Sequence, residues 1–113
     1  MACKTETFLE MKLYLDKFIA ERGWDKYRTT KNLVMALSVE VAELMEIFQW
    51  LSPQESEDAK YDLKKMEAIE EEMADVLSYL VQLSGKLNID LEKSFWKKTK
   101  KNEIKHRKQT VCR

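Results

Sequence analysis

The stretch SVEVAELMEIFQW, residues 38 to 50, sets two glutamates inside an apolar helical pattern. Apolar side chains recur through it and upstream at helical spacing, at Leu33, Leu37, Val41, Leu44, Phe48 and Leu51. This period predicts an amphipathic helix from about Thr30 to Leu51. On a wheel of about 100° per residue, Glu40 falls within the apolar arc, Glu43 lies at its border and Glu46 points to solvent. The side of the helix that must pack therefore carries carboxylates.

Helical patterns continue on both sides of this stretch. Upstream, apolar spacing predicts a helix from about Thr5 to Arg22, and Gly23 suits its carboxyl end. Downstream, SPQE at 52–55 has the composition of a capping box with proline at the first helical position. A new helix should therefore start at Pro53 and break near residues 61–63.

A second strong apolar period runs from Met66 to Leu87 and predicts a long helix. Asp90 then has the position of a cap for a last helix, from Leu91 to about Lys105. Beyond about residue 106 no apolar pattern remains, so we expect a loose basic tail.

The composition favours one all-α domain over residues 1–113, and the helices predicted above give a four- to five-helix bundle. Two glycines and one proline are too few for many strands and tight turns, whereas good helix formers abound. Twenty basic and twenty acidic residues cancel, which argues against nucleic acid or membrane as partner. No apolar run is long enough for a membrane span or a secretory signal, so a cytoplasmic protein is expected. Cys3 and Cys112 stand at opposite ends and are expected to be free thiols.

The long helix repeats the pattern of carboxylates at the edge of the core. On its wheel, Glu72, Asp75 and Tyr79 form a stripe beside the apolar arc, whereas Glu71 points away. Both helices thus carry paired carboxylates, spaced i and i+3, on the side that packs against another helix. Residues at that spacing are about 5–6 Å apart at Cβ.

Converging carboxylates need a compensating cation, and two interpretations remain open. In the first, lysine or arginine side chains pair with them at the rim of the core. In the second, a hard divalent metal such as Mg²⁺ takes an all-oxygen shell from two such pairs on antiparallel helices. Iron is disfavoured because His106, the one histidine, is out of register with Glu40 and Glu72.

Three further groups have both a functional and a structural interpretation. Lys98 and Asn102 continue the face of the last helix that begins with Leu91, and they either contact phosphates or belong to a solvated basic face. Trp24 and Trp50 flank the helix with the first glutamates. They either form the edge of the core or stack on a flat base.

The segments ERGW, NLVMALSVEVAELMEIFQW, EEEMADVLSYLVQLSGKLNIDL and KKTKKN together resemble the MazG-like all-α nucleoside triphosphate pyrophosphohydrolases. The resemblance covers about Leu15 to Asn102 and is strongest to the small single-domain branch that includes dCTP pyrophosphatases. It implies a homodimer or a dimer-of-dimers tetramer. It also implies Mg²⁺-dependent hydrolysis of a nucleoside or deoxynucleoside triphosphate, such as dCTP, to the monophosphate and pyrophosphate, with Mn²⁺ as a substitute metal.

The resemblance also implies roles for individual residues. The metal ligands and catalytic carboxylates would be Glu40, Glu43, Glu72 and Asp75. The substrate-binding residues would be Trp24, Asn32, Trp50, Tyr79, Lys98 and Asn102. The alternative function is a non-enzymatic helical interaction module, in which the carboxylates at the core edge form interhelical ion pairs.

Overall fold

The chain is all-α, as predicted from its composition. The computed structural model describes residues 7–107, and within them it contains five α-helices, two short 3₁₀ turns and no strand. The helices are α1 (Thr7–Glu21), α2 (Thr30–Phe48), α3 (Pro53–Asp58), α4 (Leu63–Lys86) and α5 (Leu91–Lys105), and the 3₁₀ turns are η1 (Asp25–Tyr27) and η2 (Ala59–Tyr61). The predicted start at Thr5, the tail beyond 107 and both cysteines lie outside the described residues.

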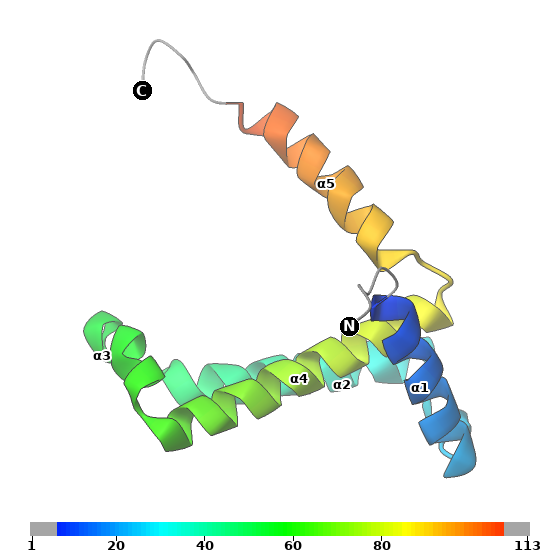
Figure 1. Ribbon diagram of the computed structural model, residues 1–113, viewed down its shortest axis with the longest axis horizontal. Helices are drawn as coiled ribbons and strands as arrows, with labels where there is room; N and C mark the ends of the chain where they lie inside the picture. Colours follow the sequence, from blue (N-terminus) through cyan, green and yellow to red (C-terminus); the bar gives the residue numbers. More distant parts are fainter. Residues whose placement is uncertain (1–6, 108–113) are drawn as a thin grey trace, which may run out of the picture.

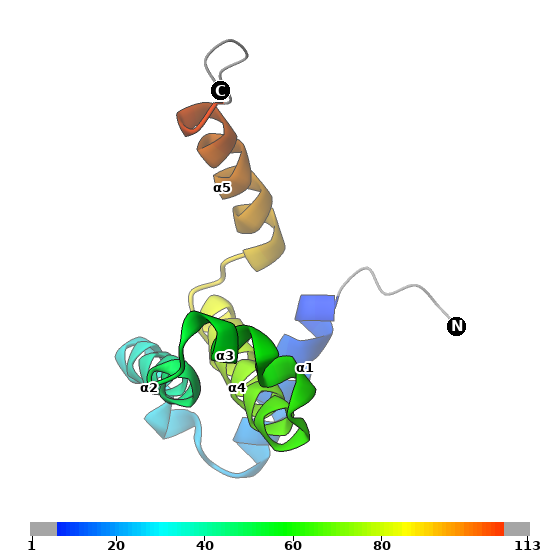
Figure 2. The same ribbon diagram turned by 90° about the vertical axis from the view of Figure 1, so that its left-hand side faces the viewer.

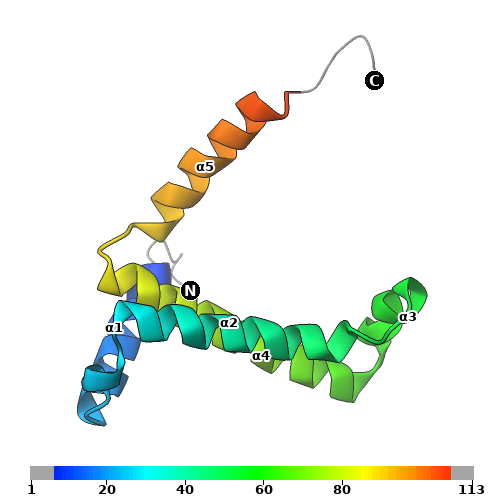
Figure 3. The ribbon, with the colours of Figure 1, turned by 180° about the vertical axis from the view of Figure 1, so that it is seen from behind.

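The packed part of the molecule is the antiparallel pair of α2 and α4, with α1 against α4 near one end (Figure 1). The view from behind shows α3 at the opposite end of that pair, where the chain turns from α2 into α4 (Figure 3). Ile19 of α1, Leu33 of α2 and Val81 of α4 are buried at the end where the three helices meet. This arrangement lays the glutamate-bearing sides of α2 and α4 against each other.

The turn between α2 and α4 forms as its sequence predicts. Ser52 Oγ accepts a hydrogen bond from Glu55 N at 3.1 Å, and Glu55 Oε1 accepts one from Ser52 N at 2.8 Å, so the capping box is confirmed. The break near residues 61–63 is also confirmed, because η2 ends there and Asp62 caps α4. α2 ends at Phe48 rather than at the predicted Leu51, since the chain must turn before Ser52 takes its extended cap conformation.

The link between α1 and α2 is short and closely bonded. Gly23 takes a positive φ of 67°, which allows Trp24 N to donate back to Ile19 O at 3.1 Å and ends α1 as predicted. The turn η1 follows, and Thr29 then caps α2 by accepting from Asn32 N. The link therefore holds Trp24 beside the first turn of α2.

α5 leads away from the other helices (Figure 1). Asn88, with φ 56°, and the cap residue Asp90 turn the chain after α4, and α5 then makes few contacts with the rest of the chain. The view turned by 90° shows the same separation (Figure 2). Phe95, Trp96 and Ile104 are 59%, 61% and 62% exposed. The last helix thus forms with its predicted bounds, but it does not join a bundle within one chain.

The core of a single chain is smaller than the apolar periods predict. Val41 of α2 and Met73 of α4 belong to predicted core faces, yet they are 47% and 57% exposed. Each side chain is therefore only about half covered, because only α1, α2 and α4 pack together closely within the described chain. Among residues 7–107, no helix combines the length and the apolar character that crossing a membrane requires.

Candidate metal centre and adjoining cavity

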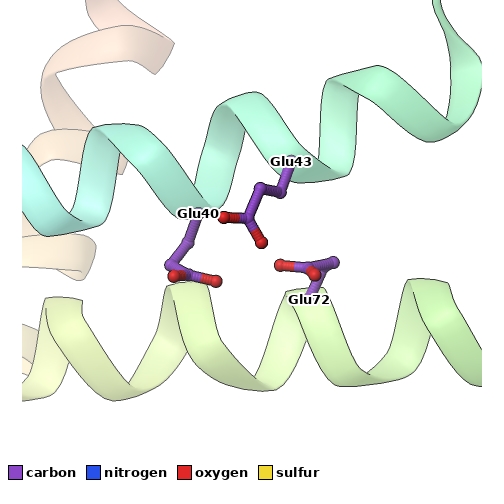
Figure 4. Close-up of side chains that lie close together, drawn as sticks. All are labelled: Glu40, Glu43 and Glu72. Carbon is purple, nitrogen blue, oxygen red and sulfur yellow. The ribbon is translucent and has the colours of Figure 1, made fainter.

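Three glutamates meet between α2 and α4. Glu40, Glu43 and Glu72 each present a carboxylate oxygen, and these oxygens all lie within 4.8 Å of one another. Figure 4 shows Glu40 and Glu43 extending from one helix toward Glu72 on the other. The helical spacing of the two α2 residues and the antiparallel packing of α4 bring them together. The sequence prediction that these carboxylates converge is therefore met for three of the four.

No cationic side chain offsets this group of three glutamates within the described part of the chain. The ion pairs found between residues 7 and 107 join Asp16, Asp25 and Asp62 to nearby lysine or arginine side chains, and none includes these glutamates. Glu72 Oε1 is buried and has no hydrogen-bond partner in the described structure. The described residues therefore do not contain the ion pairs that the structural interpretation of these carboxylates requires.

Crowding raises the pKa of two of the three carboxyl groups above its ordinary value. For Glu43, repulsion from Glu72 is the largest cause, and loss of hydration comes second. For Glu72, loss of hydration is the largest cause of the raised pKa, followed by the close approach of the Glu40 carboxylate. A group of oxygens that repel one another and lack a donor is a fitting acceptor for a hard cation.

Asp75, the fourth predicted ligand, stands beside this group without entering it. It lies about one helical turn after Glu72 on the same side of α4, and its side chain is exposed. Its charge nevertheless contributes to the raised pKa of both Glu43 and Glu72. The donor set of three converging carboxylates with a fourth nearby fits a divalent ion such as Mg²⁺, which takes oxygen ligands and keeps several waters.

A cavity of about 510 Å³ adjoins the carboxylates, between the α1–α2 link and the middle of α4. Four predicted residues line it, namely Trp24, Asn32, Asp75 and Tyr79. Trp24 is 48% exposed and meets Phe18 edge to face, with ring centroids 5.9 Å apart. The cavity thus offers a flat aromatic wall and several polar groups, and Asp75 connects it to the carboxylate group.

Trp50 does not share this cavity. It lies beyond the carboxyl end of α2, whereas Asn32 lies at the amino end, and the helical rise separates them by about 27 Å. Its side chain is 86% exposed, so its interpretation as the edge of the core is wrong for this chain. Trp24 and Trp50 cannot enclose one base within a single chain.

Lys98 and Asn102 are likewise apart from the carboxylates. Both are exposed on α5, the helix that leads away from α2 and α4. The fold of one chain therefore assembles the predicted acidic residues and part of the predicted base pocket, but not the predicted phosphate contacts.

The cavity also contains residues that sequence reasoning missed. Tyr27, Arg28 and Gln82 line it together with the predicted set. The position of Tyr27 and Arg28 in the short link between Trp24 and Asn32 could have indicated the first two, because both flanking residues are site candidates. Gln82 gave no comparable signal, since a single glutamine one turn after Tyr79 is ordinary on a helix surface.

Comparison with known sequences supports an enzymatic site. The sequence model of the MazG-like family matches residues 35–110. The chain is 38% identical to dCTP pyrophosphatase 1 of Rattus norvegicus over 90 residues, which is 80% of this chain and 53% of that protein. Against dCTP pyrophosphatase 1 of Homo sapiens it is 40% identical over 75 residues, or 66% of this chain and 44% of the other. The chain thus spans about half the length of these mammalian relatives.

Comparison with solved structures extends the likeness to the whole fold. A crystal structure of a pyrophosphatase from Archaeoglobus fulgidus superposes with a TM-score of 0.83 at 38% sequence identity. The match covers 96% of this chain and 99% of that one. The likeness therefore extends over nearly the whole chain, and it is not confined to the helices that carry the glutamates.

Proposed function

This chain belongs to the MazG-like family, and on that premise we propose that it is a nucleoside triphosphate pyrophosphohydrolase. Its substrate would be dCTP or a related deoxynucleoside triphosphate, and its products the monophosphate and pyrophosphate. The names of the mammalian relatives and of the archaeal structure support this reaction class.

The observation that carries the proposal is the group of three glutamates beside a cavity large enough for a nucleobase. Glu40, Glu43 and Glu72 lie within 4.8 Å of one another and have no cationic partner among the described residues. The cavity next to them measures about 510 Å³, which is within the usual range for small-molecule sites. An acidic group suited to a metal and a pocket with an aromatic wall are the two parts that hydrolysis of a nucleotide needs.

The residues of the chain divide into two roles in this proposal. Glu40, Glu43 and Glu72, with Asp75 nearby, would hold Mg²⁺, which when bound offsets the charge of the triphosphate and orients a water for in-line attack. Trp24 supplies a ring on which a base can stack, while Asn32 and Tyr79 line the same cavity with polar groups. The base side and the phosphate side meet at Asp75.

We also propose that the working form is a homodimer or a dimer of such dimers. α5 has few contacts within its own chain and exposes Phe95 and Trp96, which a second copy would cover. Because α5 leads away from α2, Lys98 and Asn102 would meet the phosphates of a nucleotide bound to a neighbouring copy. The basic residues of α5 and the glutamates lie apart in one chain, so α5 of one copy could reach the glutamates of another.

The test is pyrophosphate release with Mg²⁺ from each of the eight common nucleoside and deoxynucleoside triphosphates. We expect release from at least one pyrimidine deoxynucleotide, and very little from the Glu40→Gln variant. A wild-type chain that releases no pyrophosphate from any of them would refute the proposal.

The alternative, a non-enzymatic interaction module, depends on ion pairs between helices at these carboxylates. None of the ion pairs among residues 7–107 includes Glu40, Glu43, Glu72 or Asp75. Thermal melting separates the two functions, because only the enzyme should be stabilised jointly by Mg²⁺ and a non-hydrolysable dCTP analogue.

A further inference from the structure

The α1–α2 link contains one arginine that is held from two sides. The Arg28 side chain is only 12% exposed. Its Nη1 donates to Asp25 Oδ1 at 3.2 Å, and its Nη2 donates to Asp16 Oδ1 at 3.5 Å. Asp16 belongs to α1 and also accepts from Lys12 at 2.8 Å, whereas Asp25 begins η1. Arg28 thus joins the turn to the side of the preceding helix.

This arginine lies in the wall of the cavity that Trp24 and Tyr27 also form. Trp24 immediately precedes the turn that Arg28 holds, and Tyr27 ends it. On the far side, Asn32 Nδ2 donates to Tyr27 O at 3.1 Å, which joins the turn to α2. This wall consists of a short non-α-helical link, so its shape depends on the side-chain contacts at its two ends.

The third nitrogen of the Arg28 guanidinium makes no hydrogen bond within the described residues. This nitrogen, Nε, is buried. Burial of an unpaired donor is unfavourable, so the guanidinium is not placed here by optimal pairing of all its groups. The two aspartates determine its position. A lysine could not reproduce this arrangement, because a single ammonium lacks the planar fork that bridges two carboxylates.

We propose that Arg28 is a positioning residue for the nucleobase. By joining Asp16 to Asp25 it fixes the link that carries Trp24 and Tyr27, and so keeps the base-binding wall formed before the nucleotide arrives. This inference rests on the proposed pyrophosphohydrolase function and assigns to it a residue outside the metal and stacking groups. Without Arg28, ordering of the wall would have to accompany binding and would weaken it.

The test compares the steady-state kinetics of Arg28→Ala, Arg28→Lys and the wild type on dCTP. If the wall is formed only a tenth of the time without Arg28, KM rises about tenfold while kcat at saturation stays within about twofold. Arg28→Lys should not restore the wild-type KM. Inhibition by inorganic tripolyphosphate, which has no base, should keep its wild-type constant in both variants.

Two controls keep the test decisive. Arg22 is the matched control, because it stacks on Phe18 at 3.5 Å in the same region but does not line the cavity, so Arg22→Ala should keep the wild-type KM. Asp25→Asn serves if Arg28→Ala fails to fold, since Asp25 is 64% exposed and its substitution leaves the Asp16 contact in place. It should raise KM in the same direction.

Two results would overturn the inference. One is a folded Arg28→Ala or Asp25→Asn with the wild-type KM for dCTP. The other is an equal weakening of inhibition by tripolyphosphate, which would show that the substitution affects binding of the phosphates rather than of the base. In both cases the proposed function would stand. A wild-type chain without pyrophosphate release would instead overturn the function and the role of Arg28 together.

Discussion

Glu72 faces the two glutamates of α2 with one buried oxygen that has no hydrogen-bond partner among residues 7–107. Its position makes the contribution of single carboxylates measurable. Glutamine and asparagine keep the shape of the side chain but remove the charge that a divalent ion needs, so a substitution within the group should harm metal binding more than folding.

We expect Glu40→Gln or Asp75→Asn to lower the rate of pyrophosphate release with Mg²⁺ by roughly a hundredfold or more, because losing a direct ligand should cost at least as much as losing a residue that only orients one, about 10–100-fold. Melting of the metal-free variants should match or exceed the wild type, because each substitution removes a charge that repels its neighbours. Circular-dichroism melting beside the rate assay checks both expectations.

The controls are Glu46→Gln and Glu71→Gln. Both residues are exposed on the same two helices and lie outside the group of three glutamates. Each should keep the wild-type rate. If either lost as much activity as Glu40→Gln, the assignment of the metal-binding face would be wrong.

The raised pKa values predict a pH dependence of stability. Since the folded chain holds protons on Glu43 and Glu72 above their ordinary pKa of 4.5, stability should fall as pH rises from 4.5 through the raised values. Asp62 has the opposite effect at lower pH. Backbone hydrogen bonding, chiefly from Lys65, lowers its pKa below 3.8, so its contribution to stability is lost as pH falls below 3.8. We expect the melting temperature in a chelator to decrease over the window above pH 4.5.

The same melting series on Glu43→Gln and Glu72→Gln provides the comparison. Each variant should show a shallower decline than the wild type, and Mg²⁺ should stabilise the wild type more at the upper end of the window. If the melting temperature fell with pH equally in all three chains, Glu43 and Glu72 would not be the cause of the pH dependence.

At the scale of elements, local sequence rules predicted the helices well. Ser52 and Asp90 each cap a helix as predicted, and Gly23 ends α1 with a positive φ. Asp62 caps α4 at the predicted break, although it was not predicted to be the cap. Caps act within a few residues, so their signal is complete in the sequence. The bound that was wrong, at the end of α2, depends on how the chain turns into the next cap.

The direction of α5 is what periodicity could not predict. Phe95 and Leu91 follow an apolar spacing that suggests packing, yet Phe95 is 59% exposed because α5 leaves the helical pair. A wheel gives the face of a helix that prefers burial, but not the element that covers it. Val41 and Met73 were misplaced for the same reason.

Trp50, at the end of α2, tests whether an exposed ring can serve a base. We expect Trp50→Ala to change the free energy of unfolding by no more than about 0.5 kcal/mol, as usual for a surface position. Because Trp50 is outside the cavity of its own chain, it could stack only on a base bound to a neighbouring copy. In that arrangement its loss should weaken substrate binding by about 1–3 kcal/mol. Melting curves and the KM for dCTP report the two quantities.

Trp24→Ala is the paired variant, because Trp24 lines the cavity of its own chain. It should also weaken binding. If Trp50→Ala left KM unchanged while Trp24→Ala raised it, Trp24 alone would form the stacking wall. A large loss of stability in Trp50→Ala would indicate packing against another copy.

At the scale of the whole molecule, the division of the site between α5 and the helical pair predicts complementation. In the proposed site, Glu40→Gln would lack a metal ligand, and Lys98→Ala would lack a phosphate contact made to a neighbouring copy. Each should be nearly inactive alone. After the two are unfolded and refolded together, random pairing into dimers should restore about a quarter of the wild-type rate.

Sedimentation or light scattering at micromolar concentration provides the companion measurement, and a strictly monomeric chain would exclude this arrangement. So would a mixture that stays inactive although mixed dimers form. A Lys98→Ala chain with full activity would show that α5 serves only to hold copies together.

The candidate site could be predicted from the sequence only in part. Glu40, Glu43 and Glu72 were found because charges interrupt a strong apolar period, and the antiparallel helices then bring them together. The cavity residue Arg28 could not be found in that way, since its neighbours Asp16 and Asp25 meet it only after the link has folded. Contacts across a loop have no period.

The order of residues along α2 has a consequence for how a nucleotide would be released. Asn32 at the cavity and Glu40 at the carboxylates are separated by about 12 Å of helix, so α2 sets the distance between the proposed base pocket and the proposed metal site. A nucleoside triphosphate whose base occupies the cavity would reach the carboxylates with its phosphate chain. In the proposed reaction, the monophosphate product would keep contacts only at the cavity after pyrophosphate leaves, so it should bind more weakly than the triphosphate and be released.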